Sequence, residues 1–167
     1  MSFSPVADIA FNKLTDIKPE FLTKRGINLL ILDIDNTVSP YSEDEPTGEI
    51  IEWVEKMKDS GIKLFFVSNN RGERPELFSQ KLGIPYIKKA AKPLKKGTLK
   101  ALEICGNKRE ETALCGDQSF TDVLCANRCG LTSILVQPID IKNPLLAVRY
   151  FVELPFRKAA KMDFRRK

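Results

Sequence analysis

The chain contains no histidine, and this absence excludes several mechanisms before any motif is considered. Ser-His-Asp and Cys-His triads need an imidazole, and so does acid/base catalysis by histidine. Carboxylates must therefore handle any proton transfer near neutral pH. A zinc site would also be unusual, because the four cysteines show no C-x-x-C spacing.

Long apolar runs are missing as well. No N-terminal stretch combines the basic flank and apolar core of a secretion signal, and no run is long enough to cross a bilayer. Cys115 lies in a short apolar run, and Cys125 and Cys129 are one helical turn apart, as is common for buried thiols of reduced cytosolic proteins. We therefore expect an intracellular protein, cytoplasmic or bound peripherally at the inner face of the membrane.

Positive charge is concentrated at the C-terminus. The formal net charge is +5, and residues 157–167 contain six cations and one acid, so this segment alone accounts for it. A basic tail is typical of proteins that bind an anionic surface, either lipid or nucleic acid, although a solvated terminus can have the same composition. The aromatic and basic motif of an RNA-binding module is missing, which argues against nucleic acid.

Apolar runs alternate with helical patterns along the chain. Five runs are expected to form parallel strands, at residues 28–33, 62–67, 84–87, 112–116 and 132–136. Helical patterns, each followed by a glycine, lie at 47–60, 73–81, 94–104 and 121–128. Strand, helix and strand in this order are typical of right-handed βαβ units. We predict an α/β fold, a doubly wound, Rossmann-like parallel sheet of about five strands with helices on both faces.

One domain is expected over residues 1–167, with a core at about 28–137. Residues 1–27 should form a lead-in of short helix and turns. Residues 143–167 should form an amphipathic and basic extension, in which Pro155 breaks or kinks a helix before the basic tail. We expect the apolar side of this helix to pack on the sheet rather than to contact a membrane.

Polar residues recur at the ends of the predicted strands, where neighbouring parallel strands meet at one edge of the sheet. They are Asp33, Asp35, Ser68, Asn69, Lys92, Asp117 and Asp122. Asp-x-Asp, Lys-Pro and Ser-Asn are each common at turns and helix caps, so no piece is informative alone. Their order along successive strand ends predicts a phosphoryl-transfer site.

These residue types suit hydrolysis of a phosphate monoester. Asp33 can attack phosphorus and form an aspartyl-phosphate that water later cleaves. Asp35 can protonate the leaving alkoxide and then deprotonate the attacking water. Repulsion between Asp33 and the substrate would be removed by Mg²⁺ held by Asp33 and Asp117, with Asp122 as a further or outer-shell ligand.

The remaining phosphoryl oxygens need donors. Lys92 and the Ser68 hydroxyl can hold them, and Asn69, next to Ser68, is a further phosphate-binding candidate. The acidic loop 43–45 is expected to act as a small flap over the site, unless it is only a solvated turn.

In this order, the motifs resemble those of the haloacid dehalogenase (HAD) superfamily of phosphohydrolases, over about residues 29–136. Residues 33–37 match the nucleophile motif, Ser68 the phosphate-binding hydroxyl, Lys92 the lysine of the third motif, and Asp117 with Asp122 the acidic metal motif. The resemblance implies Mg²⁺ as cofactor. It also implies that Asp35 binds the metal through its backbone carbonyl, while its side chain is the acid/base.

A narrower resemblance is to the YqeG-like branch and its phosphatidylglycerophosphate phosphatase relatives, in HAD subfamily IIIA. It rests on residues 24–27, 32–37, 116–118, 121–123 and 126–128. This likeness implies a phospholipid headgroup monoester as substrate. Only 29 residues separate Thr37 from Val67 and 21 separate Asn70 from Lys92, so no large cap domain fits and an open site is expected.

Three functions therefore stay open. The favoured one is a Mg²⁺-dependent phosphatidylglycerophosphate phosphatase of phosphatidylglycerol synthesis, with the basic tail on an anionic membrane surface. The second keeps this chemistry for a soluble metabolite, such as a sugar phosphate or nucleotide. The third is a non-catalytic binding or regulatory module with a basic tail.

Overall fold

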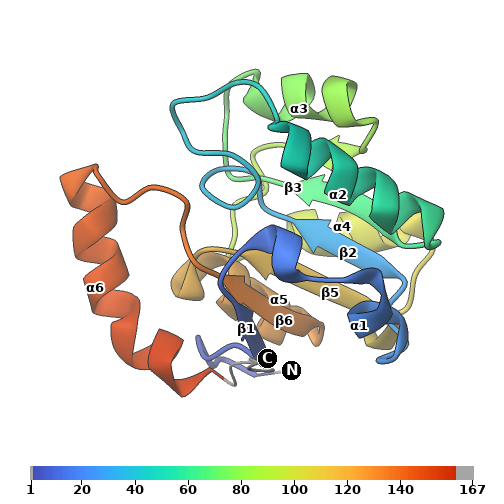
Figure 1. Cartoon of the computed structure of the whole chain (residues 1–167). Coiled ribbons are helices and arrows are strands. Elements are labelled where there is room, and N and C mark those ends of the chain that lie inside the picture. Colours follow the sequence, from blue (N-terminus) through green and yellow to red (C-terminus); the bar gives the residue numbers. More distant parts are fainter. Residues whose placement is uncertain (1, 161–167) are drawn as a thin grey trace, which may run out of the picture.

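The computed structural model describes residues 2–160, which form a parallel sheet of six strands with helices on both faces (Figure 1). The strands are β1 Ile9–Phe11, β2 Leu29–Leu32, β3 Lys63–Val67, β4 Tyr86–Ile87, β5 Thr112–Gly116 and β6 Thr132–Val136. Their order across the sheet is β1-β6-β5-β2-β3-β4, and every neighbouring pair is parallel. The predicted doubly wound α/β fold is confirmed.

Helices connect the strands. They are α1 Pro19–Thr23, α2 Gly48–Asp59, α3 Arg74–Leu82, α4 Lys96–Cys105, α5 Leu124–Cys129 and α6 Pro144–Ala159. Three short turns are η1 Leu14–Asp16, η2 Arg109–Glu111 and the π-helical turn η3 Ser119–Val123. The segment between β2 and β3 holds the single helix α2, and that between β3 and β4 holds α3, as expected for a fold without a large cap domain.

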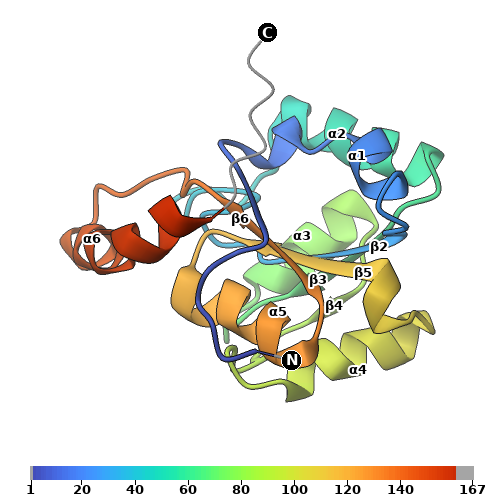
Figure 2. The same ribbon diagram turned by 90° about the horizontal axis from the view of Figure 1, so that it is seen from below.

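Helices α1 to α5 form two layers, one on each face of the sheet (Figure 2). Because side chains alternate along a strand, β2 contributes to both hydrophobic clusters. Leu30 and Leu32 pack in the cluster that contains Trp53 of α2, together with residues of α3. Leu29 and Ile31 pack in the other cluster, with residues of α4 and α5. This burial on both faces explains why β2 is apolar throughout.

The sheet has one strand more than predicted. Residues Ile9–Phe11, in the segment expected to hold only a short helix and turns, pair with β6, with Ile9 opposite Ile134. Asp8 fixes the start of this edge strand by accepting hydrogen bonds from the backbone and hydroxyl of Ser133, both at 2.9 Å. A strand of three residues is too short to show periodicity, so the pairing could not be found from the pattern.

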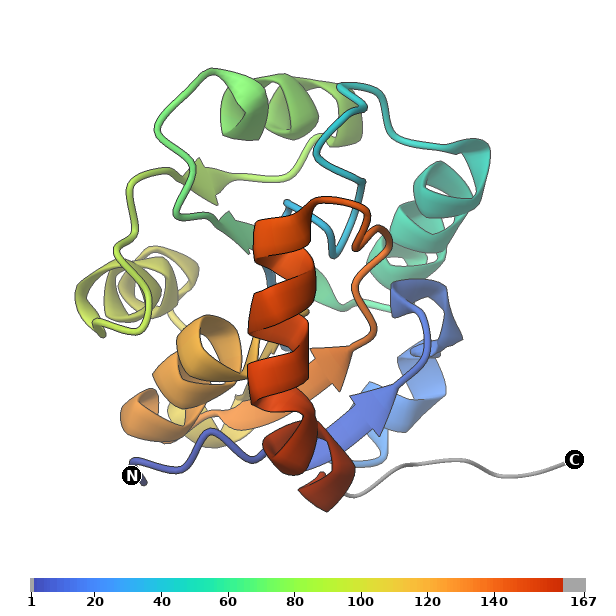
Figure 3. The same ribbon diagram turned by 90° about the vertical axis from the view of Figure 1, so that its left-hand side faces the viewer.

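The expected packing of the C-terminal helix is wrong. α6 continues through Pro155 to Ala159 and lies across the carboxyl ends of the strands (Figure 3). Four of its large apolar residues are exposed, namely Leu145, Val148, Phe151 and Val152, and others, such as Phe156, are only half-buried. Its two buried residues are Glu153 and Arg157. Arg157, which belonged to the predicted basic tail, is therefore part of the folded protein. The rest of the tail, residues 161–167, lies outside the described residues.

The two central strands, β2 and β5, mark the point where the chain changes direction across the sheet. β3 and β4 follow on one side of the pair, and β6 lies on the other. The backbone N–H of Asp33 donates to the carbonyl of Cys115 at 2.9 Å, so the ends of both strands are held together. In open α/β sheets, ligands bind at the carboxyl ends beside such a point. Among residues 2–160, no helix is long and apolar enough to span a membrane.

Candidate active site

Three buried carboxylates meet at the carboxyl ends of β2 and β5. Asp33 follows β2, Asp117 follows β5, and Asp122 lies in η3, with one oxygen of each within 4.8 Å of the others. Hard divalent cations such as Mg²⁺ prefer this kind of all-oxygen donor set. The predicted metal residues Asp33, Asp117 and Asp122 are thus brought together, and their side chains fit a divalent cation.

Burial and the charges of neighbouring carboxylates make Asp33 and Asp117 hard to ionise without a cation. Burial is the largest cause that raises the pKa of Asp33 to about 7, and the neighbouring charge of Asp122 raises it further while Lys92 opposes this. Burial, followed by the charges of Asp122 and Asp33, raises the pKa of Asp117 well above its ordinary value. A bound cation would favour the ionised forms.

Lys92 is the cation that the fold supplies to this cluster. Its Nζ lies 2.7 Å from Oδ1 of Asp33 and 2.7 Å from Oδ1 of Asp122. Burial alone would lower the pKa of Lys92, but the charges of Asp122 and Asp33 raise it overall, so the side chain stays charged. The amide of Asn69 holds the Lys92 backbone, accepting from its N–H at 2.7 Å and donating to its carbonyl at 2.9 Å.

The side chain of Asn69 is therefore occupied in positioning Lys92. Its predicted phosphate-binding role stays a prediction.

Ser68, fully buried at the end of β3, accepts a hydrogen bond from the backbone N–H of Asn70 at 3.0 Å. Thr37 donates to Oδ1 of Asp117 at 3.3 Å. This bond joins the carboxylate after β5 to residues 33–37, here called the nucleophile loop after the predicted role of Asp33.

Gly116 and the π-helical turn bring Asp122 into the cluster. A Cβ at Gly116 would lie 2.3 Å from Cγ of Asp122, so only glycine lets this carboxylate approach the end of β5. The backbone N–H of Gln118 donates to Oδ2 of Asp122 at 3.1 Å. π-Helical turns insert one extra residue and often occur at functional sites.

Asp35 is held by two donors that are distant in sequence. Arg74 donates from Nε to Oδ1 of Asp35 at 2.7 Å, and Asn70 donates from Nδ2 to Oδ2 at 3.1 Å. The buried guanidinium also donates to the carbonyls of Pro40, at 2.7 Å, and Glu43, and to the Asp44 carboxylate at 2.9 Å. The expected flap is thus joined to the proposed acid/base through one side chain.

Sequence reasoning missed Arg74. It is the first residue of α3, and a cation at a helix N-terminus is unfavourable because it faces the positive end of the helix dipole. An arginine at this unfavourable position indicates that its side chain has an acidic partner elsewhere in the fold, and this could have been inferred from the sequence.

Arg157 was missed for a different reason, because it stands at the start of the basic segment. It donates to the carbonyl of Asp117 at 2.6 Å and to the carbonyl of Val136 at 2.8 Å. α6 therefore braces the ends of β5 and β6 from outside the sheet. Only its burial in the three-dimensional structure distinguishes this arginine from the exposed cations nearby.

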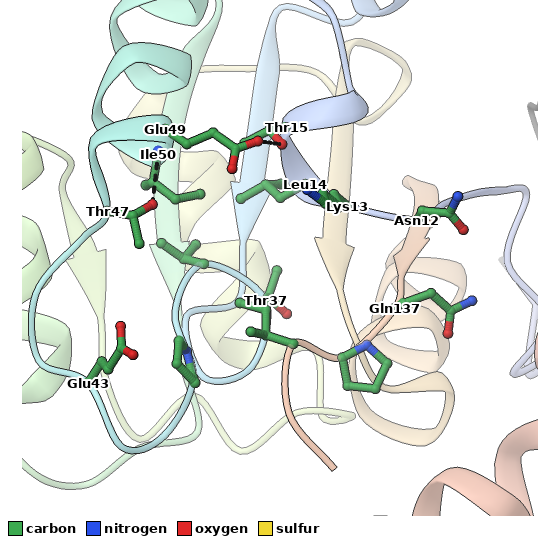
Figure 4. A pocket seen from close by; sticks show the side chains of 14 residues that line it. Asn12, Lys13, Leu14, Thr15, Thr37, Glu43, Thr47, Glu49, Ile50 and Gln137 are labelled. Atoms are coloured by element: carbon green, nitrogen blue, oxygen red, sulfur yellow. Dashed lines mark hydrogen bonds between the residues drawn. The ribbon is translucent and has the colours of Figure 1, made fainter.

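A hollow of about 460 Å³ lies beside the nucleophile loop (Figure 4). Thr37 lines it together with the first turn of α2 and the chain that follows β1 and β6. On one wall, Thr15 donates to Glu49 at 2.6 Å. The three clustered carboxylates do not line the hollow, which therefore lies beside the proposed chemical centre and not over it. A phosphate group bound at the carboxylates would lie outside the hollow, so the hollow has room only for another part of the substrate.

Comparison with known proteins gives a consistent result. The sequence profile of a family described as mitochondrial PGP phosphatase matches residues 3–140. A Bacillus subtilis (strain 168) protein named "Probable phosphatase YqeG" is 45% identical over 123 residues, which cover 74% of this chain and 72% of that protein.

Solved structures share the fold at low sequence identity. The cobalt-bound deoxy-D-mannose-octulosonate 8-phosphate phosphatase of Haemophilus influenzae has a TM-score of 0.56 at 14% identity, covering 83% of this chain and 77% of that one. A Legionella pneumophila protein assigned provisionally to HAD subfamily III A has a TM-score of 0.55 at 18% identity, covering 78% and 74%.

Proposed function

Because the chain belongs to the PGP phosphatase family, within the YqeG-like HAD phosphatases, we propose that it hydrolyses the phosphate monoester of a lipid headgroup, with phosphatidylglycerophosphate as substrate. The observation that carries the chemistry is the meeting of Asp33, Asp117 and Asp122 around Lys92 at the centre of the sheet edge. The family description supports the choice of substrate.

In the proposed reaction, a carboxylate oxygen of Asp33 forms a bond to phosphorus while the bond from phosphorus to the headgroup oxygen breaks. Asp35 gives its proton to the leaving alkoxide and later removes a proton from the water that cleaves the aspartyl-phosphate. Lys92 and Ser68 donate to the phosphoryl oxygens, and the charge of Lys92 also opposes the rise in the pKa of Asp33 that burial causes.

Mg²⁺ would be held by Asp33 and Asp117, by the backbone carbonyl of Asp35, and by Asp122 directly or through water. It would supply the charge neutralisation that lets an anionic nucleophile approach an anionic phosphate. The raised pKa values of Asp33 and Asp117 support this proposal, since a bound cation would favour their ionised forms.

An anionic membrane surface is the proposed partner, because the substrate resides in a bilayer and the basic tail carries Lys161, Arg165, Arg166 and Lys167. Changing these four residues to Gln should weaken association with anionic vesicles while leaving turnover of p-nitrophenyl phosphate unchanged. Equal vesicle association of both proteins would remove the tail from the proposal.

Phosphate release with and without Mg²⁺ tests the proposed function. The substrates are phosphatidylglycerophosphate in vesicles, glycerol 3-phosphate, a nucleoside monophosphate and p-nitrophenyl phosphate. Asp33→Asn should abolish release from all of them, while Asp59→Asn, an exposed change on α2, should not. Retained turnover in Asp33→Asn would refute the mechanism. Preference for a soluble monoester would refute the lipid substrate and support the alternative of a soluble metabolite.

A further inference from the structure

α6 buries two charged side chains against the protein and leaves one row of apolar side chains exposed to solvent, whereas an ordinary surface helix turns its charged side outward; its other large apolar residues are half-buried. Glu153 and Arg157 are only 1% and 5% exposed. The apolar residues of one helix side are between 58% and 76% exposed; they are Leu145, Val148, Phe151 and Val152. Residues three and four apart share a helix side, so these four form one continuous surface, here called the α6 apolar face.

Buried contacts fix the rotation of α6. Arg157 donates to carbonyls at the ends of β5 and β6, and Glu153 accepts from the backbone N–H of Phe120 at 3.3 Å. Turning the apolar face inward would leave both charges without these partners, at a large cost in free energy. The contacts that bury Arg157 and Glu153 therefore also keep the apolar face exposed to solvent.

The surroundings of the apolar face are basic. Lys142 and Lys158 are exposed near its two ends, and Glu153, the sole acidic residue of α6, is buried. Ile139 and Ile141, exposed by 51% and 40%, extend the apolar surface into the loop before α6. In sequence, the chain continues past α6 into four further cations and one acid. An exposed apolar stripe with basic flanks has the charge and hydrophobicity that complement an anionic bilayer.

The apolar face lies next to the catalytic edge. The amide of Asn36 exchanges two hydrogen bonds with the backbone of Asp140, at 2.6 and 2.9 Å, and so anchors the loop before α6 to the nucleophile loop. On the inner side of α6, Arg149 lines a small cleft together with Asn36 and Asp117. A surface on which α6 rested would therefore lie beside the proposed site (Figure 3).

We propose that the α6 apolar face docks on an anionic lipid bilayer, with α6 lying in the plane of the interface. This inference rests on the proposed function, because a lipid headgroup monoester has to be reached at a membrane surface. The family profile matches residues 3–140 and so ends before α6 begins. The residues of the α6 apolar face therefore lie outside the part of the chain that the profile matches.

Vesicle flotation of the full chain tests the proposal. Wild type should float with vesicles of equimolar phosphatidylcholine and phosphatidylserine, more weakly with phosphatidylcholine alone, and less at high salt. Leu145→Ser/Val148→Ser should weaken partition roughly tenfold or more, because exposed apolar area is lost. The matched control, Ile51→Ser/Ile104→Ser, removes exposed apolar residues from α2 and α4 and should behave as wild type. All three proteins should turn over p-nitrophenyl phosphate equally.

A second measurement reports insertion directly. The indole introduced by Val148→Trp should be quenched by brominated phospholipids, whereas buried Trp53 should not. Equal flotation of the double variant and wild type, or an unquenched indole, would overturn the proposal. Sedimentation velocity without lipid tests the alternative occupant. If wild type is a dimer and the double variant is a monomer, the α6 apolar face contacts a second copy of the chain, and the proposal of membrane docking is overturned. Vesicle binding that depends on α6 without hydrolysis of phosphatidylglycerophosphate would uphold the docking face and refute the substrate.

Discussion

Arg74 donates from Nε to Oδ1 of Asp35 at 2.7 Å, and the same guanidinium holds the loop that follows the nucleophile motif. The planar fork of arginine can make these bonds at the same time, whereas the single ammonium of lysine cannot. The proposed acid/base and the acidic loop 43–45 are thus held by one side chain, that of Arg74.

Arg74→Lys is expected to lower turnover about 100-fold for alkyl monoesters, because Asp35 and the acidic loop 43–45 lose the arginine that holds both of them. The loss should be smaller for p-nitrophenyl phosphate, whose leaving group needs little protonation. The ratio of kcat/KM for the two substrates, measured beside thermal stability, checks this. Arg109→Lys, in η2 before β5, is the control. Equal losses on both substrates would make Arg74 purely structural.

Lys92→Met leaves Asp33 and Asp122 buried without their shared cation. Removal of one partner of a buried ion pair costs about 3–5 kcal/mol, so the free energy of unfolding in EDTA should fall by about that much. Activity should fall at least about 100-fold, since a donor to the phosphoryl group is lost. Urea unfolding and phosphate release measure the two effects. Lys100→Met, an exposed change on α4, should alter neither.

The raised pKa of Asp33 predicts how the metal-free protein responds to pH. Between the ordinary value of 3.8 and about 7, the folded protein holds a proton on Asp33 that the unfolded chain has released. Raising the pH through this window therefore favours unfolding, and stability in EDTA should decrease toward neutral pH. Mg²⁺ should reverse the loss, because it binds the folded state.

Asp33→Asn isolates this contribution. The difference between wild type and variant, followed as thermal midpoints in EDTA from pH 4 to about 8, should grow as the pH rises. A difference that does not change with pH would show that Asp33 has an ordinary pKa in the folded protein.

Gly116→Ala should lower Mg²⁺ affinity about 10- to 100-fold, the range typical when the support of a metal ligand is disturbed. The added methyl group would lie 2.3 Å from Cγ of Asp122 and must displace that carboxylate. Isothermal titration with Mg²⁺ measures the effect. The control is Gly48→Ala at the start of α2, where an added Cβ meets nothing within 4 Å. Unchanged affinity in Gly116→Ala would place Asp122 outside the metal site.

The sequence was sufficient to predict the central strands and the catalytic edge because their signals are strong and local. β2 is buried on both faces and therefore apolar throughout, and Asp33 and Asp117 follow strands of this kind. Parallel strands must place such residues at one edge, whatever the helices between them do. Asp33, Asp117 and Asp122 could thus be grouped before any coordinates were known.

Features that depend on contacts distant in sequence could not be predicted. β1 exists because Ile9–Phe11 pair with a strand more than 120 residues away, and nothing local indicates that pairing. The spacing of apolar residues in α6 correctly predicts an amphipathic helix, but it cannot tell which side faces the protein. Buried contacts of Arg157 and Glu153 decide this, against the hydrophobic pattern.

The π-helical turn at Ser119–Val123 has a consequence for how this chain can vary. Each residue of a regular α-helix advances the side chains by about 100°, so a deletion of one residue there would rotate Asp122 away from Gly116. A relative that lacks one residue in this turn could still have all three aspartates in its sequence, but the third carboxylate would no longer point into the cluster. The number of residues between 117 and 122 is therefore as important for bringing the three carboxylates together as the identity of those residues.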